Sequence, residues 1–556
     1  MSEFMIKNKK RSENLIIACM WIIAALVMVK SIFTDFGYDN AYQIAMSYRY
    51  ISGDRMFLQM WEPHQMSKFL TDLLVLIFRV FSPDYTGVAL FTQVMGTVTS
   101  LLIAAGTVKL LSGYIDRLTG NALLIFLAVF KVKQTPFIDY AGQMIYFSIL
   151  VFCFLLLWEK ERLPVYTVLA GACTFLQVLS YPTALVSLIP AIIFLATVKG
   201  EKKGLGILAY IGGGGLPALV YAAYFIVNVG FVKLLNIATY IFYSDSHSST
   251  PHFGEYWMGL IWAAVFIIAC ALVSAVLWFT LGRKRNISFS VLAALCMAVG
   301  EPISLFVTRN LEADLRCFVY IVPSILIMFG APGIEKMTEG ERRVWLLGTA
   351  LSFASFVAAL FLSDLGILTI LAYLMLGGAV SFIPLKHVIR DYRQFLVLMV
   401  CLVLFHRGLV VWGYGNASGR VMLTTEVQNI IRDGPACGIV CDHMNKAKFS
   451  VDLEELRRSL SKDDKVLVVG PEIMDPLVFL YTEAEISNFS VIDTPKFNEA
   501  LEEYYAMNPD KFPTVVLTDC WFSVSNIPED SYIMSWVESN FEPVEDLSYY
   551  RVYRKR

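Results

Sequence analysis

Long apolar runs recur along this sequence, and they constrain the fold more than any other feature. A helix needs roughly 20 mostly apolar residues to cross the hydrocarbon core of a bilayer, and segments near that length follow one another from residue 14 to residue 412. The composition agrees, since 57% of the 556 residues are hydrophobic and only 17% are charged, against about 25% charged residues in soluble proteins. We therefore predict an integral membrane protein that is mainly α-helical.

The expected transmembrane spans number about thirteen. They lie near residues 14–33, 86–111, 119–133, 143–158, 163–180, 182–198, 204–228, 257–281, 287–308, 316–334, 343–362, 365–385 and 394–412. This count predicts a polytopic bundle of helices.

Lys and Arg residues indicate how the bundle is oriented, because they concentrate in cytoplasmic loops. If the N-terminal KNKKR is cytoplasmic, the short basic segments KLLSGYIDR, EKER, KGEKK, GRKR, EKMTEGERR and KHVIRDYR also fall inside. This holds only if residues 66–83 do not cross the membrane. That segment carries Lys68, Asp72 and Arg79, so we predict an amphipathic helix on the outer surface. Residues 34–85 then form a first outer loop with two surface helices.

Residues 416–556 differ in character from the transmembrane domain expected over 1–415. The stretch GYGNASGR marks the boundary. Beyond it, strands are expected over 465–470 and 512–519, and helices over 451–461, 495–507 and 529–540. The alternation predicts a small α/β domain, which an odd number of spans places outside the cytoplasm. With a net charge of -2 and no Gly-rich phosphate loop after a strand, neither nucleic acid nor nucleotide is an expected partner.

The first outer loop is rich in polar residues for a chain that has just crossed a membrane. Its stretch YDNAYQIAMSYRYISGDRMF predicts a helix from Asn40 to Ile51, ended by Gly53 and Asp54. Asp39 then lies at the start of that helix. Two interpretations stay open for it: an N-cap, for which Asp is among the preferred residues, or a carboxylate that lines a pocket at the membrane surface.

Several motifs follow one another in this loop. They are Tyr38-Asp39-Asn40-Ala41-Tyr42, then Arg49, then Gly53-Asp54, and finally Trp61-Glu62-Pro63-His64-Gln65 before an apolar helix. Together with one preceding span and about thirteen in all, the pattern resembles the GT-C fold of polyprenyl-phosphate-sugar-dependent membrane glycosyltransferases. That group includes the bacterial aminoarabinose transferases and the protein O-mannosyltransferases. The resemblance implies a GT-C-like domain in a bacterial cytoplasmic membrane, with the N-terminus inside.

The resemblance also implies an activity. Such enzymes move a sugar, a hexose or a pentose, from a polyprenyl phosphate in the bilayer to an extracytoplasmic polymer, lipid or protein. Because the phosphate leaves readily as an anion, a general acid is dispensable, whereas a base must take the acceptor's proton as the anomeric centre inverts. Asp39 is the candidate base. Many relatives have Asp-Glu where this chain has Asp39-Asn40, so a divalent metal is unsupported and no cofactor is expected.

Cationic and hydrogen-bonding residues are needed to hold the departing phosphate. With the motif residues, the expected binding set is Tyr38, Asn40, Tyr42, His64, Gln65, Lys133, Asp139, Arg309, Arg316 and Tyr320. The last three lie in FVTRNLEADLRCFVYIVP, which is similar to a phosphate-binding loop of the same families. Plainer interpretations stay open, since Arg316 and Tyr320 are typical interfacial anchors and Asp139 is a typical helix cap.

Further polar residues lie within the apolar segments. Glu301 is expected to face the interior of the bundle, whereas His406 and Arg407 are expected to reach the interface from the end of the last span. A transporter or flippase of lipid-linked envelope precursors is the alternative function, because it too combines many spans with a few buried charges. Transporters commonly have matching halves with broken helices, and this sequence shows no such repeat.

Overall fold

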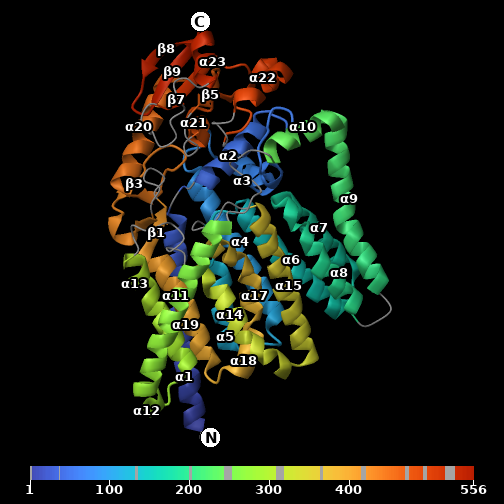
Figure 1. The fold of residues 1–556 in the computed structure, drawn as a ribbon, viewed down its shortest axis with the longest axis vertical. Coiled ribbons are helices and arrows are strands. Elements are labelled where there is room, and N and C mark those ends of the chain that lie inside the picture. Colours follow the sequence, from blue (N-terminus) through green and yellow to red (C-terminus); the bar gives the residue numbers. More distant parts are fainter. Residues whose placement is uncertain are drawn as a thin grey trace.

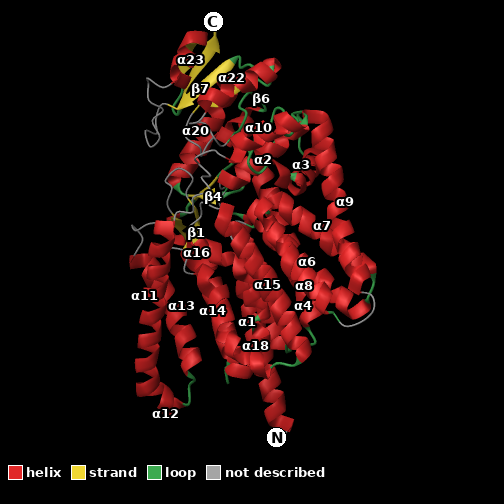
Figure 2. Cartoon of the chain, turned by 45° about the vertical axis from the view of Figure 1, so that its right-hand side comes forward, coloured by secondary structure: helices red, strands yellow, loops and turns green. Residues whose placement is uncertain are grey.

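A long bundle of helices forms most of the molecule, and a small sheet lies on one end of it (Figure 1). The C-terminus lies at the sheet end and the N-terminus at the opposite end (Figure 1). Figure 2 shows the same division, with helices through the length of the bundle and the strands of the sheet above it. The computed structural model describes residues 3–34, 36, 38–131, 136–198, 203–242, 253–307, 319–362, 367–414, 421–469, 475–491, 497–519 and 532–556.

Among these residues, seven helical segments are long and apolar enough to cross a membrane, and a bent pair brings the number to as many as eight. The seven are Lys10–Ile32, Val88–Leu111, Tyr140–Glu161, Lys203–Val229, Leu260–Arg285, Val319–Lys336 and Glu339–Phe361. The bent pair, Ile367–Val380 and Phe382–Val388, turns by 64° at its break. Shorter apolar helices cover Arg117–Val129, Pro164–Ser180, Pro182–Thr197 and Phe289–Glu301.

The predicted spans can be matched to these helices one by one. Each of the thirteen falls on a segment just named or on the helix Tyr392–Phe405. The prediction of a mainly α-helical, polytopic membrane protein with a sheet-containing C-terminal region is therefore confirmed.

The element bounds are as follows. The helices are α1 (Glu3–Ile32), α2 (Tyr38–Ile51), α3 (Phe69–Phe81), α4 (Val88–Leu111), α5 (Arg117–Val129), α6 (Tyr140–Glu161), α7 (Pro164–Ser180), α8 (Leu188–Thr197), α9 (Lys203–Val229), α10 (Phe231–Phe242), α11 (Phe253–Leu277), α12 (Arg283–Arg285), α13 (Phe289–Val307), α14 (Val322–Gly330), α15 (Glu339–Leu362), α16 (Ile367–Ile370), α17 (Met375–Val380), α18 (Phe382–Val388), α19 (Tyr392–Phe405), α20 (His443–Ser459), α21 (Asp475–Thr482), α22 (Phe497–Met507) and α23 (Tyr532–Asn540). The strands are β1 (Val411–Tyr414), β2 (Val421–Leu423), β3 (Asn429–Ile430), β4 (Val440–Cys441), β5 (Lys465–Val469), β6 (Glu485–Ile486), β7 (Val515–Asp519), β8 (Phe541–Asp546) and β9 (Tyr550–Lys555).

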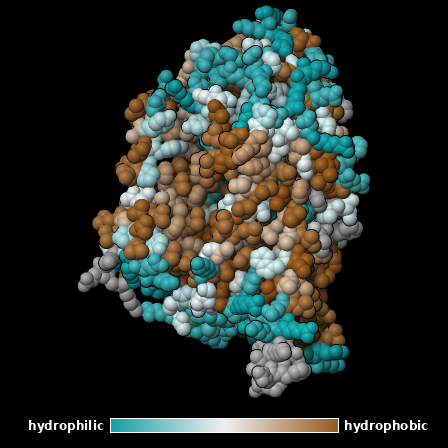
Figure 3. Space-filling view, turned by 180° about the vertical axis from the view of Figure 1, so that it is seen from behind, coloured by the Kyte–Doolittle hydropathy of each residue, from teal (hydrophilic) through white to brown (hydrophobic). Residues whose placement is uncertain are grey.

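The surface of the bundle is apolar over its middle. Figure 3 shows a broad band of hydrophobic side chains between hydrophilic ends. On α9, for example, Leu216 is 65% exposed and Val227 is 82% exposed. Apolar surface of this extent is unusual on a soluble protein, whereas lipid-facing helices require it. The chain is a multi-pass membrane protein.

Helices α2 and α3 lie between the bundle and the sheet (Figure 1). Apolar residues of α3 such as Leu73, Leu76 and Val80 are exposed. On its buried side, the Lys68 Nζ lies 2.5 Å from Asp72 Oδ2. An exposed apolar face is unfavourable in water, but it is typical of a helix that lies along the surface of a bilayer.

The C-terminal sheet has five strands in the order β6-β5-β7-β9-β8. Strand β5 pairs in parallel with β6 and β7, and β9 pairs antiparallel with β7 and β8. The two predicted strands are β5 and β7, and their interior position in the sheet explains their unbroken apolar runs. The hairpin of β8 and β9 was not predicted, because exposed charged residues interrupt its apolar pattern. The three predicted helices correspond to α20, α22 and α23.

Both ends of the first outer loop rest on the C-terminal region. At the first end, the Val440 N–H donates to the Phe33 carbonyl at 2.8 Å. At the second end, the Gly87 N–H donates to the Gly434 carbonyl at 3.0 Å. The loop is therefore held between the bundle, to which it is joined in sequence by α1 and α4, and the sheet, from which it lies far in sequence.

Candidate active site

Asp39 lies in the first turn of α2 and is partly exposed. Its Oδ1 accepts a hydrogen bond from the Tyr140 hydroxyl at 3.2 Å. Tyr140 is the first residue of α6, and Asp139 before it caps that helix by accepting from the Gly142 N–H at 2.7 Å. Asp39 and α6 are therefore joined by a hydrogen bond between the first outer loop and the bundle, across 101 positions of sequence.

His64 is brought to the same place. Its ring stacks on Tyr140, with centroids 3.6 Å apart and planes 4° from parallel. Tyr42 approaches the His64 ring edge-on at 6.5 Å, and Tyr181 at the end of α7 lies 6.0 Å from it. The imidazole thus fixes the orientation of the phenol that contacts Asp39. We call Asp39, Tyr42, His64, Tyr140 and Tyr181 the Asp39 cluster.

The turn that carries His64 is held by hydrogen bonds within the loop. The Gln65 Oε1 accepts from the Phe57 N–H at 3.1 Å, and Phe57 has a positive φ of 59°, which costs a non-glycine residue conformational energy. The Gln43 Nε2 also donates to the Ser67 Oγ at 3.1 Å. Gln65 is buried and serves this turn, so its expected contact with substrate stays a prediction.

A second group of polar residues lies inside the bundle around Arg407, which is 6% exposed. Its Nη2 donates to the Tyr320 hydroxyl at 3.0 Å and to the Lys131 carbonyl at 2.6 Å. The Lys131 ammonium in turn donates to the Ser100 Oγ at 2.6 Å and to the Tyr146 hydroxyl at 3.0 Å. The Nε and Nη1 of Arg407 are buried and have no hydrogen-bond partner among the described residues. We call Arg407, Tyr320 and Lys131 the Arg407 cluster.

Arg407 is the functional candidate that the sequence interpretation missed. The expectation that His406 and Arg407 reach the interface is wrong, since His406 is 2% exposed and Arg407 is 6% exposed. The His406 Nε2 lies 3.1 Å from Glu301 Oε1, and Glu301 does face the interior as expected. A charged pair at the end of an apolar run was the available signal, but sequence alone does not distinguish a buried pair from an interfacial one.

Both clusters contact the first part of α6, the Asp39 cluster through Tyr140 and the Arg407 cluster through Tyr146. Lys131 and Asp139 stand near the two ends of the connection from α5 to α6. On α4, the partner Ser100 comes twelve residues after Val88, or about 18 Å along the axis at 1.5 Å per residue. The Arg407 cluster therefore contacts α4 about halfway along that helix.

The remaining predicted site residues are placed as follows. Asn40 and Tyr42 are buried. The side chain of Tyr38 and the residues Lys133, Arg309 and Arg316 lie outside the part that the structure describes. Within the described part, no group of three or more His, Cys, Asp or Glu residues could hold a metal ion.

No protein-family model matches this sequence, and no curated protein is similar to it in sequence. Solved structures do resemble it. The crystal structure of the Archaeoglobus fulgidus oligosaccharyltransferase in complex with Zn and sulfate is 13% identical, with a TM-score of 0.46 over 90% of this chain and 68% of that chain. The oligosaccharyltransferase AglB from the same organism, in complex with an inhibitory peptide and a dolichol-phosphate, is 14% identical, with a TM-score of 0.45 over 92% and 70%.

A third structure, the same oligosaccharyltransferase tethered with an acceptor peptide, is 12% identical at a TM-score of 0.46 over 90% and 69%. At these values the likeness assigns no activity to this chain.

Proposed function

We propose that this protein is an inverting membrane glycosyltransferase, which moves a sugar from a polyprenyl-phosphate donor to an acceptor outside the cytoplasm. The observation that carries the proposal is the presence of a partly exposed carboxylate and a buried cation in two clusters that both contact the first part of α6. The carboxylate is Asp39, oriented by the Tyr140 hydroxyl at 3.2 Å. The cation is Arg407, with two of its nitrogens unpaired among the described residues.

In the proposed reaction, a hydroxyl oxygen of the acceptor attacks the anomeric carbon of the sugar. The new bond joins that oxygen to the anomeric carbon, and the bond from that carbon to the phosphate oxygen breaks with inversion. The acceptor proton passes to the Asp39 carboxylate, and the polyprenyl phosphate leaves with the bonding electron pair. A positioned carboxylate of this kind contributes roughly 10²–10⁴-fold as a general base.

The residues around Asp39 orient it for this step. The Tyr140 hydroxyl donates to the Asp39 Oδ1 at 3.2 Å and so orients the carboxylate that takes the acceptor proton in this proposal. His64 holds the Tyr140 ring by stacking at 3.6 Å. Asn40, Tyr42 and Asp139 remain proposed contacts of the sugar or the acceptor.

The Arg407 cluster is suited to the phosphate. A buried guanidinium with unpaired N–H groups is costly, and a phosphate oxygen would satisfy those groups with charge-assisted hydrogen bonds. The cluster is cationic, because Lys131 and Arg407 lie there and Lys30 donates to the Arg407 carbonyl at 2.7 Å, with Glu301 as the described carboxylate beside them. Lys133, Arg309 and Arg316 are proposed as further phosphate contacts.

The test uses the full chain in a lipid nanodisc with labelled polyprenyl-phosphate hexoses and pentoses. Asp39→Asn is expected to lower transfer at least about 100-fold and to leave donor binding within about twofold, because the amide keeps the shape but accepts no proton. Asp84→Asn is the matched control, since Asp84 lies in the same loop and is partly exposed; it accepts from the local Thr86 N–H at 2.9 Å and lies 4.0 Å from Arg457 Nη2. Transfer retained in Asp39→Asn would exclude Asp39 as the base.

A further inference from the structure

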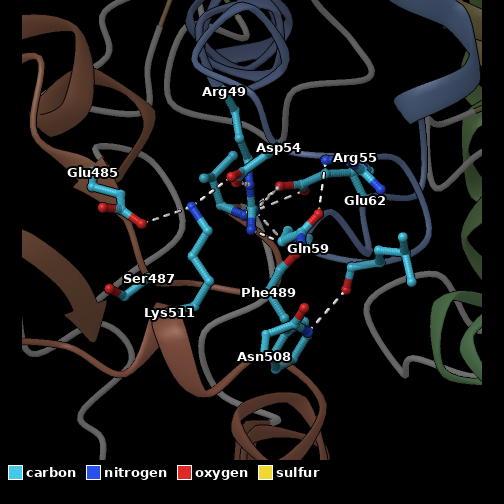
Figure 4. A network of polar contacts seen from close by, with 12 residues as sticks. Arg49, Asp54, Arg55, Gln59, Glu62, Glu485, Ser487, Phe489, Asn508 and Lys511 are labelled. Carbon is cyan, nitrogen blue, oxygen red and sulfur yellow. Dashed lines mark hydrogen bonds and ion pairs between the residues drawn. The ribbon is translucent and has the colours of Figure 1, made fainter.

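Arg49, in the last turn of α2, is 1% exposed and is surrounded by acceptors (Figure 4). Its Nε donates to Asp54 Oδ2 at 2.6 Å, and its Nη1 donates to Glu62 Oε1 at 3.2 Å and to the Phe489 carbonyl at 3.1 Å. Its Nη2 donates to the Gln59 carbonyl and to the Tyr504 hydroxyl. All five N–H groups of the guanidinium therefore have partners, on both the first outer loop and the C-terminal region.

Glu62, in the first outer loop, accepts further hydrogen bonds from the C-terminal region. It is fully buried, and its Oε2 accepts from the Ser490 hydroxyl at 2.7 Å while its Oε1 accepts from the Val491 N–H at 3.0 Å. The neighbouring Trp61 N–H donates to the Phe489 carbonyl at 2.8 Å. The turn before His64 is thus bonded directly to the segment that follows β6.

Asp54 receives a second cation from the C-terminal region. The Lys511 Nζ lies 2.5 Å from Asp54 Oδ1 and 3.0 Å from Glu485 Oε1 (Figure 4). Lys511 and Asp54 are both buried. Removing one member of such a set would leave a buried charge uncompensated, which is strongly unfavourable. The interface therefore favours the one arrangement in which all these charges are paired. We call the residues that form it the Arg49 lock. It consists of Arg49, Asp54, Gln59, Glu62, Phe489, Ser490, Val491, Tyr504 and Lys511.

The lock is continuous with the candidate active site. Asp39 and Arg49 lie in the first and last turns of the same helix, about 15 Å apart along its axis at 1.5 Å per residue. His64 follows Glu62 by two residues. The Asp39 carboxylate and the His64 ring are thus carried by two segments whose other ends meet at the Arg49 guanidinium.

We infer that the C-terminal domain is a positioning element of the active site, which holds Asp39 and His64 in place through the Arg49 lock. The inference rests on the proposed function and extends it to the sheet-containing region. Arg49 is a positioning residue, because its partners are protein groups. The inference also explains why Arg49, Asp54 and Glu62 occur together with the Asp39 motif: they belong to the lock, and the chemistry is carried by other residues.

The first test compares Arg49→Gln with Arg79→Gln in the full chain. Arg79 also bridges the loop and the C-terminal domain, with its Nη2 3.5 Å from Glu483 Oε2, but it is partly exposed and outside the lock. We expect Arg49→Gln to lower kcat at least about tenfold, since misplacement of a reacting group by about 1 Å costs up to 100-fold, and to leave donor KM within about twofold. Arg79→Gln is expected to change kcat less than about twofold. A folded Arg49→Gln protein with parental kcat would overturn the inference.

The second test does not depend on sugar transfer. Hydrogen–deuterium exchange at residues 38–46 is expected to rise in Arg49→Gln and to stay at the parental level in Arg79→Gln. Ser490→Ala is the milder variant if Arg49→Gln fails to fold, because it removes only the hydroxyl that donates to Glu62. It should raise exchange in the same residues to a smaller extent. Unchanged exchange at 38–46 in a folded lock variant would refute the positioning role, whereas altered exchange without any detectable transfer in the parent would refute only the proposed function.

Discussion

Two buried arginines in this molecule have opposite surroundings. Arg49, between the first outer loop and the C-terminal region, has an acceptor for each N–H group. Arg407, inside the helix bundle, has acceptors for its Nη2 only, among the described residues. A satisfied buried charge holds a structure together, whereas an unsatisfied one is costly and is a candidate for binding a ligand. The comparison supports the proposals that the first arginine positions the active site and that the second binds the donor phosphate.

Exchanging each arginine for glutamine should separate the two roles most clearly. Arg407→Gln is expected to weaken binding of a polyprenyl-phosphate sugar and to lower transfer by about 10²–10³-fold, the range found when one electrostatic stabiliser of a reaction is removed. Its thermal stability should stay near the parental value, because the parental Nε and Nη1 have no partner in the part of the chain that the structure describes. Arg49→Gln, by contrast, should lose about 3–5 kcal/mol of stability, as expected for breaking a buried pair.

Arg393→Gln is the control for Arg407→Gln, because Arg393 lies at the other end of α19, is partly exposed and pairs with Asp116 at 3.2 Å. It should leave donor binding unchanged. If Arg407→Gln binds the donor as the parent does and melts at a much lower temperature, the two arginines have the same role and the comparison fails.

Tyr140→Phe should have the next largest effect. It removes the hydroxyl that donates to Asp39 at 3.2 Å but keeps the ring on which His64 stacks. Since a hydrogen bond to a charged group contributes about 1.5–3 kcal/mol, kcat is expected to fall at least about tenfold. Tyr166→Phe is the matched control, because Tyr166 also donates to a carboxylate, Glu161, at 2.9 Å on an exposed surface. Equal kcat values for the two variants would contradict the role of Tyr140.

The smallest expected effect concerns the stability that Tyr85, at the end of the first outer loop, contributes at alkaline pH. Burial raises the pKa of Tyr85 to about 12, with Arg79 opposing the rise and Glu483 adding to it. An unfolded tyrosine titrates near pH 10, so the folded state keeps this proton through a range where the unfolded state loses it. The stabilisation from Tyr85 is therefore present below about pH 10 and is lost as the pH rises toward 12. The melting temperature of Tyr85→Phe, measured from pH 8 to 11.5, should fall less steeply than that of the parent.

Much of the fold could be predicted because it depends on local pattern. Apolar runs of bilayer length identified the helices of the bundle, and unbroken apolar runs identified β5 and β7. The start of α2 was also predictable to within two residues, which put Asp39 in its first turn. The hairpin of β8 and β9 was missed, because charged residues on its exposed positions hide the apolar alternation.

The candidate site could be predicted only in part. The loop motifs indicated Asp39 and His64, and the structure joins both to Tyr140. Tyr140 itself was not predicted, since a tyrosine at a helix start near a membrane is commonplace. Arg407 was wrongly predicted to lie at the interface. Its burial depends on which helices surround α19, and the sequence of α19 does not contain that information.

By itself, the sequence determined that this chain crosses a membrane many times, carries a polar loop after its first span and ends in a region with buried strands. These properties follow from the pattern of hydrophobic side chains among residues close together in the sequence, and that pattern is present before the chain folds. Only the tertiary structure decided that Arg49 meets Phe489 across 440 positions and that Arg407 meets Lys131 across 276. Such pairs form because packing excludes water from a buried cation. Its N–H groups then need acceptors from the protein, and the fold decides which acceptors lie near.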